Sequence, residues 1–376
     1  MIVAGRLLLE GSLIRGAIQI SGGKIARVFH SAIPDDALHA SIVAPGFIDA
    51  QVNGAFGYDV AQPGGIREIA RRLAQTGVTA FLPTVISSPP EVYARLPDEL
   101  EAGRAILGAH PLGLHVEGPL LSPARAGAHP RAPIENADLD CLLPLIERDA
   151  LRMITLAPER PKALAWIKRL CGHGVVCSLG HTDCDDATFR DAVDAGATLV
   201  THLYNAMSPF HHRVPGAIGA ALDDDRVTVS LIADGVHCHP VAARLALRAK
   251  GVSRVLLATD GVAAVGMGPG RYRLGSENIV VDHHVARLED GTLAGSTLTL
   301  DRAVREMIAM TRCSTIDALR MASGVPARVL KLPAKGRIAT GYDADLTLLD
   351  EHLGVTATLV GGRIAYRRKT DVSASA

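Results

Sequence analysis

Acidic and imidazole side chains stand at the ends of several short apolar runs, and their types suit metal-assisted hydrolysis. Glu117 and His202 each end such a run, and His181 follows a third run after one glycine. Two imidazoles and one carboxylate form a usual ligand set for catalytic zinc, with one position left for water. The same donors also suit iron and other divalent ions, so zinc is the first expectation and the identity of the ion stays open.

Asp260 directly follows a fourth apolar run, Val255–Thr259, so its carboxylate should lie beside the ion. There it can accept a proton from water whose pKa the ion lowers, and it can return that proton to a leaving group. An aspartate at this position can also cap the first turn of a helix. The sequence therefore offers a catalytic and a structural interpretation of Asp260.

Eight apolar runs alternate with helix-like stretches from about residue 45 onward, which predicts a (β/α)₈ TIM barrel. The runs are Gly46–Val52, Ala80–Thr84, Leu112–Glu117, Met153–Ala157, Val175–Leu179, Leu199–His202, Val227–Ala233 and Val255–Thr259. The clearest helical stretches are Gly65–Gln75, Pro161–Leu170, Asp185–Ala195 and Pro240–Arg248. No G-x-G-x-x-G follows the first run, so a dinucleotide-binding fold has no support. In a barrel the active site lies at the carboxyl ends of the strands, where the four residues above stand.

Both ends of the chain contain short strand-like segments, including Lys24–Phe29 near the start and Gly336-Arg337-Ile338 near the end. We therefore expect residues 1–44 and 336–369 to meet in one small β-sandwich domain, with the catalytic barrel at 45–335. The last residues, 370–376, have the composition of a flexible tail.

Charge and composition exclude several classes of partner. Lys plus Arg equals Asp plus Glu at 39 each, and aromatic residues make up 3% of the chain. The protein thus has neither the basic field nor the stacking residues expected of a nucleic-acid-binding protein, and no apolar segment is long enough to span a membrane. The six cysteines form no C-x-x-C pair. We expect reduced thiols and a cytoplasmic location.

The motifs together resemble the amidohydrolase superfamily and, within it, the N-acetylglucosamine-6-phosphate deacetylases. The resemblance covers nearly the whole chain: Ala44–Asp49, the run His202-Leu203-Tyr204-Asn205-Ala206-Met207, Ala233–His237, Leu293–Ser296 and Gly341–Leu346. The first and last of these are common to the superfamily, whereas the other three are more specific. The resemblance implies hydrolysis of the acetamide of N-acetyl-D-glucosamine 6-phosphate to acetate and D-glucosamine 6-phosphate.

The resemblance also implies a role for each site residue. Glu117, His181 and His202 would be the metal ligands, Asp260 the acid and base, and His129 the group that polarises the acetyl carbonyl. The substrate-contacting positions would be Gln51, Asn53, Ala128, Asn205, Ala206, Arg213, His237, Leu293, Ala294 and Gly295. Among these, Arg213 and His237 would bind the sugar phosphate, with Arg213 reaching the site of a neighbouring subunit. A homodimer is therefore implied.

One departure from the superfamily pattern bears on the number of metal ions. Where many amidohydrolases have His-x-His after the first strand and bind two ions, this chain has Gln51-Val52-Asn53. An amide is a poor ligand for a transition metal, so we expect one divalent ion per subunit.

Three alternatives remain open on sequence. An N-acetylgalactosamine-6-phosphate deacetylase differs only in the epimer accepted, which a few loop contacts decide. A nucleobase deaminase or cyclic-amide hydrolase on the same barrel often uses a bridging lysine, but Lys162 and Lys168 lie in a helix-like stretch. A non-catalytic scaffold would typically have lost metal ligands, and here the single-metal set is complete.

Overall fold

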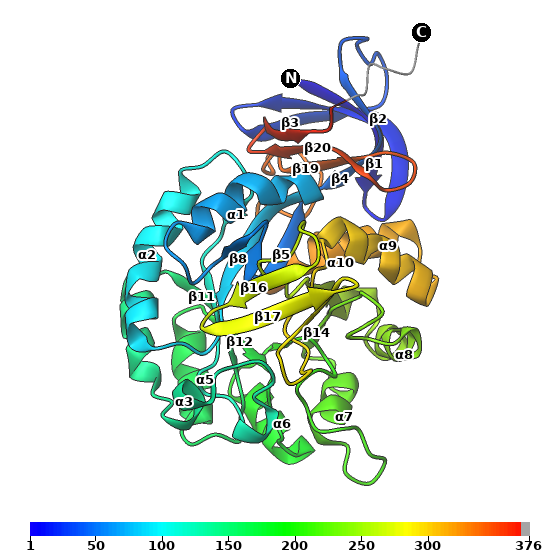
Figure 1. Ribbon diagram of the computed structural model, residues 1–376. Coiled ribbons are helices and arrows are strands. Elements are labelled where there is room, and N and C mark those ends of the chain that lie inside the picture. The colour runs from blue at the N-terminus through cyan, green and yellow to red at the C-terminus, as the bar shows by residue number, and fades with distance from the viewer. Residues whose placement is uncertain (370–376) are drawn as a thin grey trace.

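The computed structural model describes residues 1–369 and contains two main sheets. Figure 1 shows a ring of helices around one sheet, with the first and last strands of the chain lying together at the top in blue and red. The tail predicted at 370–376 lies outside the described residues.

The larger sheet confirms the predicted TIM barrel. Its parallel strands are β5 (Phe47–Val52), β8 (Val78–Val85), β10 (Leu114–Glu117), β11 (Leu151–Leu156), β12 (Val176–Leu179), β13 (Leu199–Val200), β14 (Thr228–Leu231) and β15 (Val255–Leu257), with β9 (His110–Pro111) beside β8. Every predicted run overlaps one of these eight strands. Nearly all of their residues are buried, as expected where helices cover a parallel sheet, and this explains why each strand is an apolar run in the sequence.

The first and last barrel strands meet at their carboxyl ends. Asn53 and Gly54 donate their backbone N–H groups to the carbonyl of Gly261, at 2.8 and 2.9 Å. Val52 and Gly261 also form an isolated parallel bridge. This closure brings the residues after β5 next to those after β15.

Helices follow most of the barrel strands. The longer ones are α1 (Gly65–Leu73), α2 (Pro90–Arg104), α5 (Ala163–Gly172), α6 (Asp186–Asp194), α7 (Gly216–Asp223), α8 (Pro240–Lys250), α9 (Leu300–Thr311) and α10 (Thr315–Ala322). The short ones are α3 (Arg131–Glu135), α4 (Leu143–Glu147) and α11 (Gly324–Val329). No helix among residues 1–369 is long and apolar enough to cross a membrane.

The second sheet joins both ends of the chain. Its strand order is β21-β20-β19-β4-β1-β2-β3, with β1 (Ile2–Leu9), β2 (Ser12–Ser21), β3 (Lys24–Phe29), β4 (Leu38–Pro45), β19 (Leu346–Leu349), β20 (Val355–Val360) and β21 (Arg363–Arg367). Its face buries a separate apolar cluster that includes Leu7, Ile18 and Leu346. We propose that the domain boundaries fall at residues 44–45 and 335–336, on either side of this sheet.

One predicted strand in this region is wrong. Gly336-Arg337-Ile338 forms a bend and not a strand. Gly336 has a φ of +78°, and a Cβ added there would lie 2.5 Å from the Cβ of Ala327. The segment is therefore packed tightly against α11, and the glycine marks this close approach to the helix.

The amino-terminal end of the barrel is closed by apolar side chains, which we call the base cluster. It consists of Ile48, Ala50, Ala80, Leu82, Met153, Val176, Leu199, Leu256 and Ala258 from the strand regions, and Val325, Ala327, Val329 and Leu330 from α11 and the residue after it. All are at least nine-tenths buried. Because this end is filled with packed side chains, the strands leave room for a ligand at their opposite, carboxyl ends.

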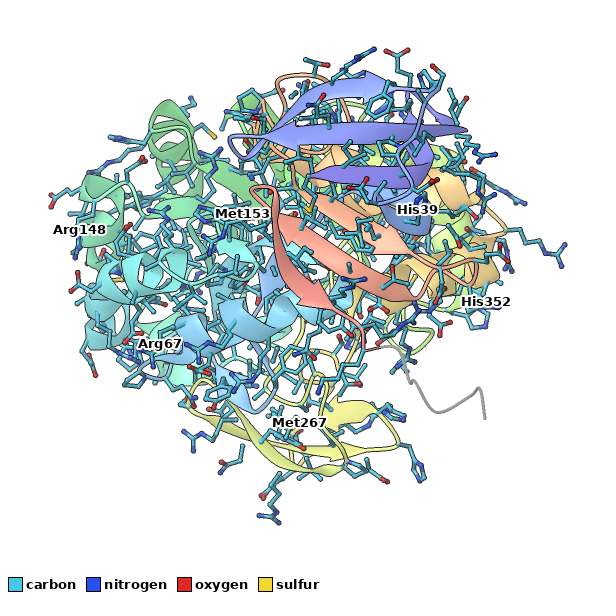
Figure 2. All side chains as sticks on the ribbon, turned by 90° about the horizontal axis from the view of Figure 1, so that it is seen from above. His39, Arg67, Arg148, Met153, Met267 and His352 are labelled. Carbon is cyan, nitrogen blue, oxygen red and sulfur yellow. The ribbon has the colours of Figure 1, made fainter. Side chains whose placement is uncertain are left out.

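A three-stranded antiparallel sheet interrupts the pattern between β15 and α9, and the sequence analysis did not predict it. Its strands are β16 (Gly270–Leu274), β17 (Glu277–Asp282) and β18 (Val285–Arg287). Seen from above, this sheet, near Met267, projects from the margin of the molecule (Figure 2), and in Figure 1 it crosses in front of the barrel strands. Its buried residues Leu274, Ile279 and Ala286 pack against Ile86 and Ala128 of the barrel loops.

Candidate active site

The carboxyl ends of the barrel strands bring the predicted site residues together. Glu117 ends β10, His181 and His202 stand two residues after β12 and β13, and Asp260 stands three residues after β15. His181, His202 and Asp260 have φ values of +48°, +30° and +50°, which non-glycine residues seldom adopt. Such conformations cluster at functional sites, where they aim side chains that an extended strand would direct elsewhere.

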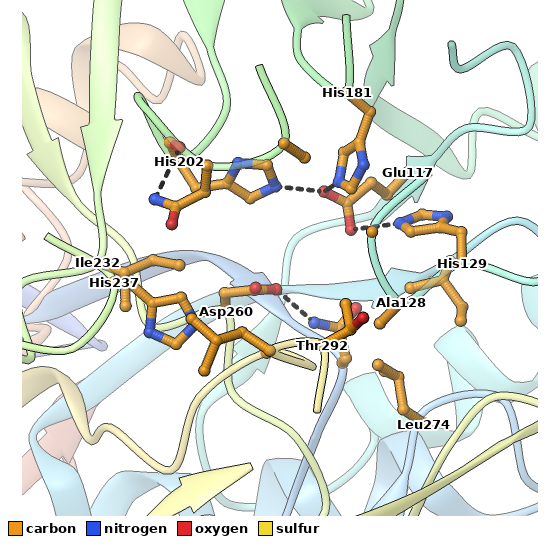
Figure 3. Close-up of a pocket in the computed structure, with 17 residues that line it drawn as sticks. Glu117, Ala128, His129, His181, His202, Ile232, His237, Asp260, Leu274 and Thr292 are labelled. Carbon is orange, nitrogen blue, oxygen red and sulfur yellow. Dashed lines mark hydrogen bonds and ion pairs between the residues drawn. The ribbon is translucent and has the colours of Figure 1, made fainter. Parts of the chain in front are cut away.

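These residues line a pocket of about 250 Å³. Figure 3 shows the three imidazoles around Glu117 on one side and Asp260 with His237 on the other. The lining residues are Asn53, Ile86, Glu117, Gly127, Ala128, His129, His181, His202, Asn205, Ala206, Ile232, His237, Asp260, Leu274, Thr292, Leu293 and Gly295. All predicted site residues are in this set except Gln51, Ala294 and Arg213. Gln51 and Ala294 are buried close by, whereas Arg213 is exposed on a loop.

Glu117 is the centre of the imidazole cluster. Its Oε1 lies 3.0 Å from Nε2 of His202 and 3.3 Å from Nε2 of His181, and its Oε2 lies 3.4 Å from Nε2 of His129. Burial opposes ionisation of this carboxyl, but its contacts with the three imidazoles outweigh that effect and hold its pKa well below the usual value. Glu117 is therefore ionised in the folded protein, as a metal ligand must be.

Two amide side chains hold Asp260. Nε2 of Gln51 donates to both Glu117 Oε1 and Asp260 Oδ1 at 3.0 Å, and Nδ2 of Asn53 donates to Asp260 Oδ1 at 2.7 Å. Burial raises the pKa of Asp260 to about 6, and the charge of Glu117 adds to the rise. A carboxyl with a pKa near neutrality is suited to both accept and return a proton. No helix begins at Asp260, so the helix-cap interpretation is wrong.

Comparison with known proteins identifies the family. The model of the amidohydrolase family matches residues 42–365. The chain belongs to this family. It is 39% identical to human N-acetylglucosamine-6-phosphate deacetylase, over 96% of this chain and 94% of that one. It is also 37% identical to an N-acetylgalactosamine-6-phosphate deacetylase of Escherichia coli O157:H7, over 96% of this chain and 98% of that one.

A solved structure agrees with these sequence relatives. A variant of N-acetyl-D-glucosamine-6-phosphate deacetylase from Mycobacterium smegmatis, in complex with N-acetyl-D-glucosamine-6-phosphate, superposes with a TM-score of 0.90 at 36% identity. The match covers 97% of this chain and 99% of that chain. The amidohydrolase fold predicted from the sequence is therefore confirmed over nearly its full length.

Amidohydrolases depend on a metal ion, and this site has the donors to hold one. Glu117, His129 and His181 offer ligand atoms that all lie within 4.8 Å of one another. That trio contains His129 in place of the predicted His202, although His202 is the imidazole closest to Glu117. Geometry alone therefore leaves four candidate ligands around one point.

The hydrogen bonds at the far side of the ring distinguish His181 from His129, whereas Nδ1 of His202 has no such partner among the described residues. Nδ1 of His181 lies 2.9 Å from the carbonyl of Arg125, which can only accept, so Nδ1 carries the proton and Nε2 presents its lone pair. In His129 the ring proton is on the other nitrogen, because the backbone N–H of Ser87 donates to Nδ1 at 3.2 Å. Nε2 of His129 therefore carries a proton. In this arrangement His181 can offer a lone pair to a cation, and His129 can donate a hydrogen bond.

His129 is also held neutral. Burial lowers its pKa to about 4, and the neighbouring His181 contributes to the fall. A neutral imidazole with its proton on the pocket-facing nitrogen is suited to donate to a carbonyl oxygen. The Ser87 hydroxyl, 3.0 Å from Nδ1, adds a second contact that fixes the ring.

Sequence reasoning missed several parts of the site. Leu274 and Thr292 come from the region of the unexpected β16–β18 sheet. The alternation of exposed and buried residues in β17 is the pattern from which this sheet could have been predicted. His115 lies fully buried below Glu117, with its Nε2 2.8 Å from the hydroxyl of Thr155. Burial lowers the pKa of His115 to about 4, so it contributes a neutral imidazole to the layer of side chains below the site.

Proposed function

We propose that this protein hydrolyses the acetamide of N-acetyl-D-glucosamine 6-phosphate, releasing acetate and D-glucosamine 6-phosphate. The observation that carries the proposal is the convergence of Glu117, His181, His202 and Asp260 in one pocket, with His129 prepared as a donor opposite. The named relatives act on this substrate class and match nearly the whole chain.

We assign one divalent ion to each subunit, held by Glu117, His181 and His202, with zinc as the first expectation. When bound, such an ion lowers the pKa of water and polarises a carbonyl. The single-ion assignment rests on Gln51 and Asn53, whose amide N–H groups point at the carboxylates. A donor in that place cannot coordinate a second cation.

The remaining chemistry is carried by the chain itself. Asp260 accepts a proton from the attacking water and delivers it to the departing amine. The Nε2–H of His129 donates to the acetyl carbonyl oxygen, where negative charge develops in the transition state. The ionised Glu117 also favours retention of the proton on Asp260, which keeps its pKa close to the range where the exchange is easy.

Loops at the pocket rim bind the sugar in this account. We assign this role to Ala128, Asn205 and Ala206 on one side and to Leu293, Ala294 and Gly295 on the other, largely through backbone groups. Gln51 and Asn53 would contact the acetamide end, next to Asp260. The apolar walls formed by Ile86, Ile232 and Leu274 limit access of water to the reacting bond.

Recognition of the phosphate requires a second copy of the chain. No lysine or arginine is among the residues that line the pocket. Arg213 is exposed on a loop whose neighbours Phe210 and Val214 are 58% and 62% exposed, which is unusual for large apolar side chains. We infer a homodimer in which this loop packs on the partner and Arg213 reaches the partner's site, where His237 also binds the phosphate.

We also infer a cytoplasmic location. All six cysteines are free, and Cys177, Cys184 and Cys238 are buried. Unpaired thiols of this number are usual in a reducing compartment.

The galactosamine epimer is the second candidate substrate, because the E. coli relative named for it is 37% identical. An acetate-release assay on the phosphorylated and unphosphorylated forms of both sugars, with metal content measured alongside, tests these assignments. We expect rapid release from N-acetyl-D-glucosamine 6-phosphate and about one ion per chain. Release from the galactosamine epimer alone would show that N-acetyl-D-galactosamine 6-phosphate is the substrate. Absence of both activity and metal after reconstitution would favour a non-catalytic scaffold.

A further inference from the structure

The pocket has few groups of its own that can attract an anion. Glu117 and Asp260 contribute negative charge, and no lysine or arginine is among its lining residues. Three other imidazoles already have partners: His129 contacts Ser87, His181 contacts Arg125, and His202 contacts Glu117. Among the lining residues, His237 is the imidazole outside this cluster.

His237 is held by a carboxylate that the sequence analysis did not consider. Its Nδ1 lies 2.7 Å from Oδ2 of Asp234, and the two side chains are only 6% and 10% exposed. Oδ1 of Asp234 accepts the backbone N–H groups of Val236 and His237 at 2.9 and 2.8 Å. Gly235, with a φ of +76°, makes the tight turn that directs these N–H groups back to the carboxylate.

This contact fixes which ring nitrogen of His237, a residue that lines the pocket, carries a proton. Burial opposes ionisation of Asp234, but its contacts with His237 and the backbone outweigh that effect and lower its pKa. An ionised carboxylate can only accept, so Nδ1 carries a proton and Nε2 is the ring nitrogen left without this partner. Because Nδ1 keeps its proton, Nε2 can donate to an anion only when the ring carries both protons.

We propose that Asp234 is a positioning residue that holds the proton on Nδ1 of His237, so that the ring contacts the phosphate of the substrate as a donor carrying both protons. The proposal rests on the proposed function, because it requires a phosphorylated ligand. A neutral His237 protonated on Nδ1 would present a lone pair to the phosphate and repel it. By fixing the proton on Nδ1, the contact with Asp234 leaves the phosphate a ring that can bind it only as a donor from Nε2.

Asp234→Asn separates charge from geometry. The asparagine Oδ1 can still accept the two backbone N–H groups, so the turn is retained, while the ring loses its anionic partner. We expect the KM for N-acetyl-D-glucosamine 6-phosphate to rise about tenfold, which corresponds to roughly 1.4 kcal/mol. The kcat should change less than about threefold, because the metal ligands and Asp260 are untouched.

A double-mutant cycle shows whether Asp234 acts through His237. His237→Gln should raise the KM by a similar or larger factor, and adding Asp234→Asn to it should have no further effect. Asp225→Asn is the matched control, since it removes the same charge at the exposed amino-terminal approach to β14, away from the pocket. An equal additional loss in the His237→Gln background, a fall in kcat for phosphorylated and unphosphorylated sugars alike, or an unchanged KM would overturn the proposal.

A measurement on the unaltered protein covers the case in which Asp234→Asn does not fold. The ¹⁵N signals of His237, assigned by their loss in His237→Gln, should show a protonated Nδ1 throughout a titration with inorganic phosphate, and Nε2 should shift as phosphate binds. An unprotonated Nδ1, or no shift of Nε2, would contradict the role of Asp234. Failure of the proposed function is distinct, since wild-type protein would then release acetate from none of the sugars.

Discussion

The two ends of the barrel are built from the same eight strands but differ in what they place inside. The mouth holds Glu117, Asp260 and three imidazoles within a few ångströms, on backbone that adopts positive φ at three positions. The base holds a cluster of packed apolar side chains, closed by Val325 and Leu330. Buried charge and backbone strain cost stability, whereas apolar packing provides it. A barrel strand can therefore contribute apolar packing in its first half and a reactive side chain at its carboxyl end.

The sharpest test of this division removes the charge of Glu117, a proposed metal ligand at the mouth. Glu117→Gln keeps the shape of the side chain but removes the charge, so the ion should be lost and acetate release should fall on the order of 10³-fold. Thermal stability of the metal-free protein should change little, because the base is intact. Metal analysis, activity and Tm of the same preparation check this. Full metal content in the variant would show that other residues hold the ion.

His129→Asn should have the next largest effect. Loss of one preorganised donor to the carbonyl oxygen typically lowers kcat by about 10²- to 10³-fold. Because His129 carries its proton on Nε2, it is not a ligand in our account, and metal content should be unaffected. Loss of the ion together with activity would instead place His129 in the metal site, in agreement with the Glu117–His129–His181 grouping.

A substitution in the base cluster should lower stability and leave turnover nearly unchanged. Leu330 is fully buried in the base cluster, so Leu330→Ala should lower the free energy of unfolding by about 2 to 5 kcal/mol. The kcat of the folded variant should remain within about twofold of wild type. Urea unfolding and initial rates below the transition measure the two effects. A large loss of kcat without loss of stability would contradict the separation of the two ends.

Asp49 lies between Ile48 and Ala50 of the base cluster, and its expected effect is confined to the pH dependence of stability. Burial raises its pKa to about 7, although Thr259 donates to it through its hydroxyl and N–H. The folded protein therefore keeps a proton that the unfolded chain has lost, so this group makes the protein less stable as pH rises from about 4 to about 7. Asp49→Asn should remove up to about 1.4 kcal/mol per pH unit of that slope in urea unfolding. An unchanged slope would show that Asp49 is ionised in the folded protein.

The difference between the two ends also explains what could be predicted from the sequence. Parallel strands buried on both faces leave apolar runs such as Val78–Val85, and residues that end such runs must meet at the mouth. This was enough to bring Glu117, His181, His202 and Asp260 together. The β16–β18 sheet does not have such runs: β17 alternates exposed and buried residues, which is the different pattern of a sheet with one exposed face.

Contacts that depend on long-range geometry also could not be predicted from the sequence. The distinction between His181 and His129 rests on Arg125 and Ser87, which no spacing rule connects to these rings. The bend at Gly336 looked like part of a strand because its packing against α11 is visible only in the fold. Motifs thus identified the residue types of the site, and the structure assigned their protonation.

The central claim is that one ion and Asp260 divide the chemistry at the mouth. Asp260→Asn tests it most directly, since the amide fills the same space but cannot accept a proton. Metal content and acetate release from N-acetyl-D-glucosamine 6-phosphate should be measured on the same sample. We predict about one ion per chain, as in wild type, with kcat lowered by about 10²- to 10⁴-fold. Near-normal turnover at full metal content would contradict the account.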